Sequence, residues 1–151
     1  MTSPSDISVE LFVYPATVEE IAPGDFILRF PDIPEAITGG DTPDQALANG
    51  PDALSAAIEG YLELDRPAPS PRAAQAGEYP VPLDPELAAR VILSKAMSEL
   101  GVTNVALAKR MNRDEKAVRR ILSGKHASFS MTLEALKALG RRPALSIAAY
   151  V

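Results

Sequence analysis

The chain has 151 residues, of which 46% are apolar and 23% are charged. This length is enough for one ordinary domain or two small ones, and the apolar share can fill a core, which excludes a disordered tail. No apolar stretch approaches the roughly 20 residues of a membrane-spanning helix, and the acidic start lacks the basic segment of a secretory signal. We therefore expect a cytoplasmic protein that does not partner with a membrane.

Cysteine is absent and histidine occurs once. These counts exclude disulfides, cysteine nucleophiles, thiolate zinc sites and metal centres built from several histidines. Much of enzyme chemistry is excluded with them.

The net charge of -5 hides a division of charge along the chain. Residues 1–85 carry three basic residues against 15 acidic ones, a balance of -12, whereas residues 86–151 carry 12 against five, a balance of +7. The basic half suits a polyanion and the acidic half suits a cationic protein surface. Thirteen of the 14 prolines precede residue 86. We therefore expect a domain over residues 1–66, a proline-rich linker over 67–84 and a second domain over 85–151.

The first domain and the linker are expected to supply a small sheet. Residues 7–14 and 26–30 are rich in β-branched and aromatic side chains, and a Pro-Gly-Asp turn at 23–25 precedes the second run. The two runs predict an antiparallel hairpin with a rather long connection. Residues 36–38 can add a short third strand. Residues 78–83 favour one more strand, which their prolines confine to a sheet edge.

A helix is expected to follow from Thr42, which can cap it through its hydroxyl. Pro43 suits the first helical position, and Gln45 stands where the reciprocal residue of a capping box belongs. Apolar residues then recur every three or four positions, as on the buried face of a helix. Because proline removes a backbone donor, we expect this helix to kink or restart at Gly50-Pro51.

The second domain is expected to consist of four short helices, delimited by capping residues and by glycine or asparagine. The helices begin at Asp84, Thr103, Asp114 and Ser130 or Thr132, and three of them end at Gly101, Asn112 and Gly140.

The last segment, residues 143–151, alternates like a strand but has no pairing edge in its own domain. A lone strand leaves its backbone groups unpaired. We expect it to pair with the same strand of a second chain, which predicts a homodimer and leaves open whether dimers associate into a tetramer.

Residues 105–124 have the layout of a helix-turn-helix. Ala108 is small where the two helices approach, Asn112 suits a left-handed turn, and Val118 fills the angle between the helices. The second helix would face base edges in the major groove, and flanking cations would meet phosphates. The expected base contacts are Glu115, Lys116, Arg119 and Arg120, and the expected phosphate contacts are Lys109, Arg113, Lys125 and His126.

Other interpretations of these residues stay open. The basic side chains can be the solvated face of a plain helical bundle, although the charge division argues against it. Glu115 suits a first-turn carboxylate stabilised by the helix dipole as well as it suits a base contact.

Several segments together resemble the HicB antitoxins of bacterial toxin-antitoxin pairs, in the version that carries a C-terminal Xre-like helix-turn-helix domain. The resemblance covers nearly the whole chain. In chain order, the segments are residues 24–34, 37–42, 60–63, 81–83, 114–120 and 126–128.

The resemblance implies an α+β protein whose N-terminal domain is a partial RNase-H-like sheet with a helix and has no nuclease activity. We therefore expect a protein that is not an enzyme, with no catalytic residues, no metal and no cofactor. The C-terminal domain would be an all-α helix-turn-helix domain ending in a dimerisation strand. It further implies that the first domain binds HicA, a small basic toxin that cleaves messenger RNA. The second domain would bind the operator DNA of its own operon as a dimer and repress it.

The charge division gives this pairing of partners a physical basis. An acidic domain is repelled by RNA but attracted to an RNA-binding surface, whose active site it can cover. We expect the toxin to contact the first strands and the segment from residue 30 to 41. The expected contact residues are Phe30, Asp32, Glu35 and Asp41.

Two other functions stay open. An RNase-H-type fold could hold Mg²⁺ through Asp32, Asp41 and Asp44, although no histidine or lysine base joins them and acidic residues beside proline and glycine are ordinary turn residues. Alternatively, the first domain could bind a small ligand in a stand-alone transcriptional regulator.

Overall fold

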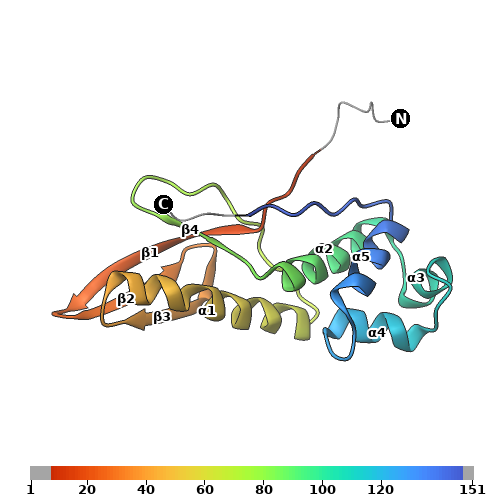
Figure 1. The fold of residues 1–151 in the computed structure, drawn as a ribbon, viewed down its shortest axis with the longest axis horizontal. Coiled ribbons are helices and arrows are strands. Elements are labelled where there is room, and N and C mark those ends of the chain that lie inside the picture. Colours follow the sequence, from red (N-terminus) through yellow and green to blue (C-terminus); the bar gives the residue numbers. More distant parts are fainter. Residues whose placement is uncertain (1–7, 148–151) are drawn as a thin grey trace.

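The computed structural model describes residues 8–147. Over these residues the fold is α+β, with a four-stranded antiparallel sheet and five helices (Figure 1). The strands and α1 lie at one end of the molecule and α3, α4 and α5 at the other, with α2 between them (Figure 1). The strands are β1 (Val13–Ala22), β2 (Asp25–Phe30), β3 (Ile33–Gly40) and β4 (Tyr79–Pro82), and the helices are α1 (Pro43–Glu63), α2 (Pro85–Leu100), α3 (Asn104–Arg110), α4 (Glu115–Ser123) and α5 (Phe129–Ala138).

The sheet has the strand order β3-β2-β1-β4. The predictions for β2 and for a proline-bearing edge strand at β4 are confirmed. The prediction for the first strand is wrong, because β1 begins at Val13 and continues through residues 15–22, which were expected to be a connection. Antiparallel pairing with β2 from Thr17 to Ala22 draws this stretch into the sheet. Its acidic residues cost little there because they are exposed.

Helix α1 begins as predicted, with the Thr42 hydroxyl accepting a hydrogen bond from the Gln45 backbone N–H at 3.1 Å. The Gln45 side chain accepts from the backbone of Asp41, at 2.7 Å, rather than from that of the capping residue. The predicted restart at Gly50-Pro51 is wrong, since α1 runs from Pro43 to Glu63 as one helix with Pro51 inside it. Gly50 is buried against β2, and this packing keeps the helix continuous despite the missing backbone donor.

The helical half follows the predicted caps closely. Asp84, Thr103 and Asp114 cap α2, α3 and α4, and Gly101 ends α2 in the left-handed conformation with φ of +62°. The last helix begins slightly earlier than expected, because Ser128 caps it by accepting from the Met131 backbone N–H at 3.2 Å.

Two hydrophobic cores lie on either side of α2. Leu87 and Val91 of this helix belong to the core formed by the sheet and α1. Ala89 and Leu93, from other positions of the same helix, belong to the core shared with α3, α4 and α5. Helix α2 therefore connects the two halves through packing on both sides.

The proline-rich segment after α1 is held against the sheet. The buried Tyr14 donates its hydroxyl hydrogen to the Pro69 carbonyl at 2.8 Å, and the Arg72 backbone N–H donates to Asp32 at 3.2 Å. Burial, with the negative charge of Asp32 nearby, raises the pKa of Tyr14 to about 12. These two hydrogen bonds tie the segment to Tyr14 of β1 and to Asp32, which lies between β2 and β3.

The C-terminal segment forms no strand over residues 141–147 of this single chain, and residues 142–147 are exposed. The remainder of the predicted dimerisation strand, residues 148–151, lies outside the described residues. Among residues 8–147 no single helix is long and apolar enough to cross a membrane. Helices α2 and α3 reach the required length and apolar composition only when they are taken together, and they are bent by 108° from each other.

Candidate interaction surfaces

Helices α3 and α4 are joined by a tight turn of four residues, 111–114. Asn112 adopts a left-handed backbone with φ of +53°, and the Arg113 N–H donates to the Ala108 carbonyl at 2.9 Å. Ala108 and Val118 are buried between the helices, at 4% and 0% exposure. The turn and the two small apolar contacts fix the angle at which α4 leaves α3.

Helix α4 buries one face and exposes a basic one. Val118 and Ile121 point into the helical core, and the Asp114 carboxylate caps the helix by accepting from the Ala117 N–H at 2.8 Å. Helical geometry places residues three and four apart on one side, so the exposed Lys116, Arg119 and Arg120 share the outer surface.

Two of the predicted base contacts bind each other. The Glu115 carboxylate accepts a hydrogen bond from the Arg119 guanidinium at 2.7 Å, one turn further along α4. The Arg119 side chain is 67% exposed, so this pair lies at the solvent boundary. Glu115 therefore orients Arg119 in the free protein, in addition to standing in the first turn of α4.

The predicted phosphate contacts differ in whether their side chains are already paired with a carboxylate. Lys109, Lys125 and His126 are exposed, whereas Arg113 is paired with Glu134 of α5 at 3.2 Å. Arg110 is also exposed on α3 and was missed, although its place directly after Lys109 in a basic run could have indicated it. The exposed cations therefore lie on α3, before α4, and on the loop that follows α4.

Phe30, one of the predicted toxin contacts, is placed wrongly by the sequence analysis. Its side chain is 1% exposed and belongs to the core beneath α1. The cause is strand alternation on β2, which turns Leu28 and Phe30 inward and leaves Arg29 exposed. Phe30 shapes the acidic domain but presents no surface to a partner.

Two of the three predicted acidic contacts already have partners. Asp32 lies 3.5 Å from the Arg72 guanidinium nitrogen Nε. Glu35 accepts hydrogen bonds from the Tyr61 hydroxyl at 2.8 and 2.9 Å. Hydrogen bonding from its own backbone N–H and from Tyr61 lowers the pKa of Glu35, which keeps this carboxylate ionised. Asp41 is exposed at the turn before α1.

The tip of the β1–β2 hairpin carries acidic residues that the sequence analysis did not single out. Glu19, Glu20 and Asp25 are all exposed, and Ile21 beside them is 50% exposed. Glu20 accepts from the Gly24 N–H at 3.1 Å, which steadies the turn. Their clustering around the Pro-Gly turn was the available indication. With Asp41, they make the acidic surface larger than the segment from residue 30 to 41.

No group of three or more acidic or histidine side chains in the described part of the chain is arranged to hold a metal ion. Asp32, Asp41 and Asp44 therefore form no metal cluster among residues 8–147.

Comparison with known proteins identifies relatives across most of the chain. A family model described as "HicB_like antitoxin of bacterial toxin-antitoxin system" matches residues 13–95. The chain is similar to Antitoxin HicB 1 of Photorhabdus laumondii, with 36% identity over 89% of this chain and 86% of the relative. It is also similar to Antitoxin HicB of Pseudomonas fluorescens (35% identity, 92% and 96% coverage) and of Escherichia coli strain K12 (29%, 87% and 96%).

Proposed function

Because the chain belongs to the HicB-like antitoxin family of bacterial toxin-antitoxin systems, we propose that it carries out both tasks of an autoregulating antitoxin. Its acidic domain, residues 1–66, covers the active site of a HicA-type toxin that cleaves messenger RNA. Its basic domain, residues 85–151, binds the operator DNA of its own operon through α3 and α4 and represses transcription.

The single observation that carries this proposal is the matching of charge to structure. The balances of -12 and +7 fall on two halves that have separate cores. Long-range attraction steers each half toward a different macromolecule, a cationic protein for the sheet and a polyanion for the helices.

Occlusion of the toxin is supported by exposed carboxylates at the hairpin tip and at Asp41. The sheet and α1 provide a rigid support for these charges, as a partial RNase-H-like domain would. In this role the protein contributes no catalytic residue, metal or cofactor. Its toxin acts on messenger RNA, so we place the complex in the cytoplasm.

Operator binding is supported by the geometry of a helix-turn-helix. The tight turn between α3 and α4, the buried Val118 and the basic outer face of α4 suit a helix that enters the major groove. Lys116, Arg119 and Arg120 contact bases in this arrangement, and Lys109, Lys125 and His126 contact phosphates.

Dimerisation through residues 143–151 would place two copies of α4 on successive half-sites of the operator, about one helical turn of DNA apart. Deleting these residues is expected to convert the dimer to a monomer and to weaken operator binding. A truncated chain that still sediments as a dimer would contradict this part of the proposal.

The proposal is tested with the purified full-length chain and the small basic protein encoded beside it. The chain should bind that protein and stop its cleavage of RNA, and it should bind the promoter region of its own operon more tightly than random DNA. Binding of neither partner would refute the proposal. Metal-dependent RNA cleavage by the chain alone would favour a nuclease, and ligand-induced thermal stabilisation would favour a small-ligand sensor.

A further inference from the structure

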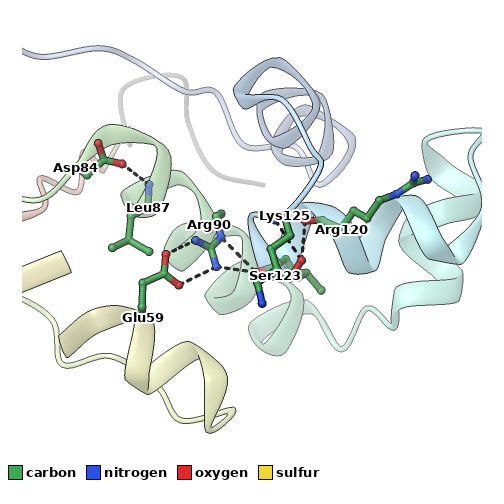
Figure 2. Close-up of polar contacts among 8 residues, drawn as sticks. Glu59, Asp84, Leu87, Arg90, Arg120, Ser123 and Lys125 are labelled. Atoms are coloured by element: carbon green, nitrogen blue, oxygen red, sulfur yellow. Dashed lines mark hydrogen bonds and ion pairs between the residues drawn. The ribbon is translucent and has the colours of Figure 1, made fainter. Parts of the chain in front are cut away.

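The buried Arg90 of α2 joins elements from both halves of the molecule. Its guanidinium donates to both carboxylate oxygens of Glu59 in α1, at 2.5 and 3.0 Å (Figure 2). Its Nε and Nη2 atoms also donate to the Leu122 carbonyl in the last turn of α4, at 3.2 and 3.1 Å. Arg90 is 8% exposed, so its guanidinium is largely shielded from water, whereas the Glu59 side chain is 39% exposed.

The Leu122 carbonyl is one of the last four of α4, which have no partner within the helix. A cation at this end also opposes the negative end of the helix dipole. Arg90 therefore satisfies the C-terminal end of α4 both as a hydrogen-bond donor and as a charge.

The turn after α4 packs directly on the same guanidinium. Gly124 has φ of +70°, and a Cβ atom at this position would lie 2.6 Å from Nη1 and 2.7 Å from Cζ of Arg90. Lys125 follows at once, with its backbone N–H donating to the Ser123 hydroxyl at 3.3 Å (Figure 2). Arg90 thus fixes both the end of α4 and the start of the loop that carries Lys125 and His126.

We infer that Arg90 is a positioning residue for operator binding, and that Glu59 of the acidic domain holds it in place. This inference rests on the proposed DNA-binding role of α4 and names a residue pair outside the DNA-facing surface. Arg90 contacts no DNA itself. It sets the placement of α4 and of the following loop relative to α2.

The geometry requires both members of the pair. A lysine at residue 90 would keep the charge but lack the planar fork that reaches Glu59 and the Leu122 carbonyl together. Without the Glu59 carboxylate, the guanidinium would lose the contact that directs it toward the end of α4. Operator affinity therefore depends on a carboxylate that lies in the other half of the chain.

The test compares Glu59→Gln with Glu78→Gln in the full-length chain. Each variant removes one negative charge and the carboxylate partner of an arginine, but Glu78 pairs with Arg72 beside the sheet, away from α4. Measured by fluorescence anisotropy on operator DNA, Glu59→Gln should bind about 3- to 10-fold more weakly than Glu78→Gln. Equal affinities of the two variants would overturn the inference.

The salt dependence of binding separates positioning from direct contact. The slope of log affinity against log salt counts the phosphates that a protein neutralises. Arg90→Gln, which removes the positive charge, should weaken operator binding with an unchanged slope. A slope reduced by about one phosphate would place residue 90 on the DNA backbone and overturn the positioning role.

An NMR measurement on the free protein keeps the inference testable if a variant is less stable. Glu59→Gln should shift the amide resonances of Gly124 and Lys125 and speed their hydrogen exchange, whereas Glu78→Gln should leave them unchanged. Unchanged resonances in Glu59→Gln would also overturn the inference. If the wild-type chain binds no DNA, the proposed function itself fails, and this inference fails with it.

Discussion

The Arg119→Ala variant tests most sharply whether α4 distinguishes bases. Arg119 is 67% exposed and contributes nothing to either core, so its truncation should leave the fold intact. The loss is confined to DNA contacts and to the ion pair with Glu115.

The size of the effect follows from these two contributions. A bidentate contact from arginine to a base is worth about 1 to 3 kcal/mol of discrimination. Binding must first release Arg119 from Glu115, and an exposed pair one turn apart on a helix is worth only about 0.3 to 0.5 kcal/mol. The net loss is then about 0.5 to 2.7 kcal/mol, or roughly 2- to 100-fold in affinity for the operator.

Anisotropy titrations of operator and random DNA at one salt concentration measure this loss. Lys109→Ala is the control, because a lysine that contacts phosphate should weaken both DNAs by a similar factor. For Arg119→Ala, the affinity for random DNA should change little beyond the loss of one positive charge. An equal loss on operator and random DNA would refute the assignment of Arg119 to base contacts.

Three further predictions concern stability and are measured by denaturant unfolding. Phe30→Ala should lower the free energy of unfolding by about 3 to 5 kcal/mol, because the side chain is buried in the core; a loss under about 1 kcal/mol would contradict that placement. Gly40→Ala should lower the free energy of unfolding by about 1 to 3 kcal/mol, because the new Cβ atom would lie 2.6 Å from the Ala46 backbone nitrogen in α1. Gly60→Ala is the control: a Cβ atom at residue 60 meets no other atom within 4 Å, so this variant should be more stable by about 0.5 to 1 kcal/mol. Two hydrogen bonds from Arg72 lower the pKa of Glu78 from 4.5 to about 2. Between pH 4.5 and 2 the unfolded chain therefore binds more protons than the folded one, so the free energy of unfolding should fall as the pH drops through this range. An equally steep fall in Glu78→Gln would exclude this carboxylate as a cause.

Local chemistry made the helix boundaries predictable from the sequence. Thr42, Asp84, Thr103 and Asp114 each cap a helix through the hydrogen bond that their side chains suggested. Such caps depend on residues three positions away and need no knowledge of the fold.

Features set by distant parts of the chain were not predictable in this way. The extent of β1 depends on its pairing with β2, and the continuity of α1 through Pro51 depends on packing against the sheet. The burial of Phe30 follows from which face of β2 the helix covers. The link from Arg90 to Glu59 joins residues 31 positions apart, and no sequence pattern indicates it.

The charge division suggested two surfaces, but the free carboxylates on them required the structure. Arg72 engages Asp32 and Tyr61 engages Glu35, whereas Asp41 and Glu19 lie exposed. The sequence gives the positions of the acidic residues along the chain. The structure is needed to show which carboxylates are already paired and which are exposed to a partner.

The most direct test of the central claim is a paired titration of the full-length chain with the HicA-type toxin and with operator DNA. A Glu19→Lys, Asp41→Lys double variant should lose about tenfold or more of its toxin affinity, because like charges then face each other, and should not lose operator affinity. A Lys116→Glu, Arg120→Glu double variant should show the opposite pattern. If either variant lost both partners while remaining folded, or if the acidic-domain variant still bound the toxin with wild-type affinity, the division of the two tasks between the two halves would be contradicted.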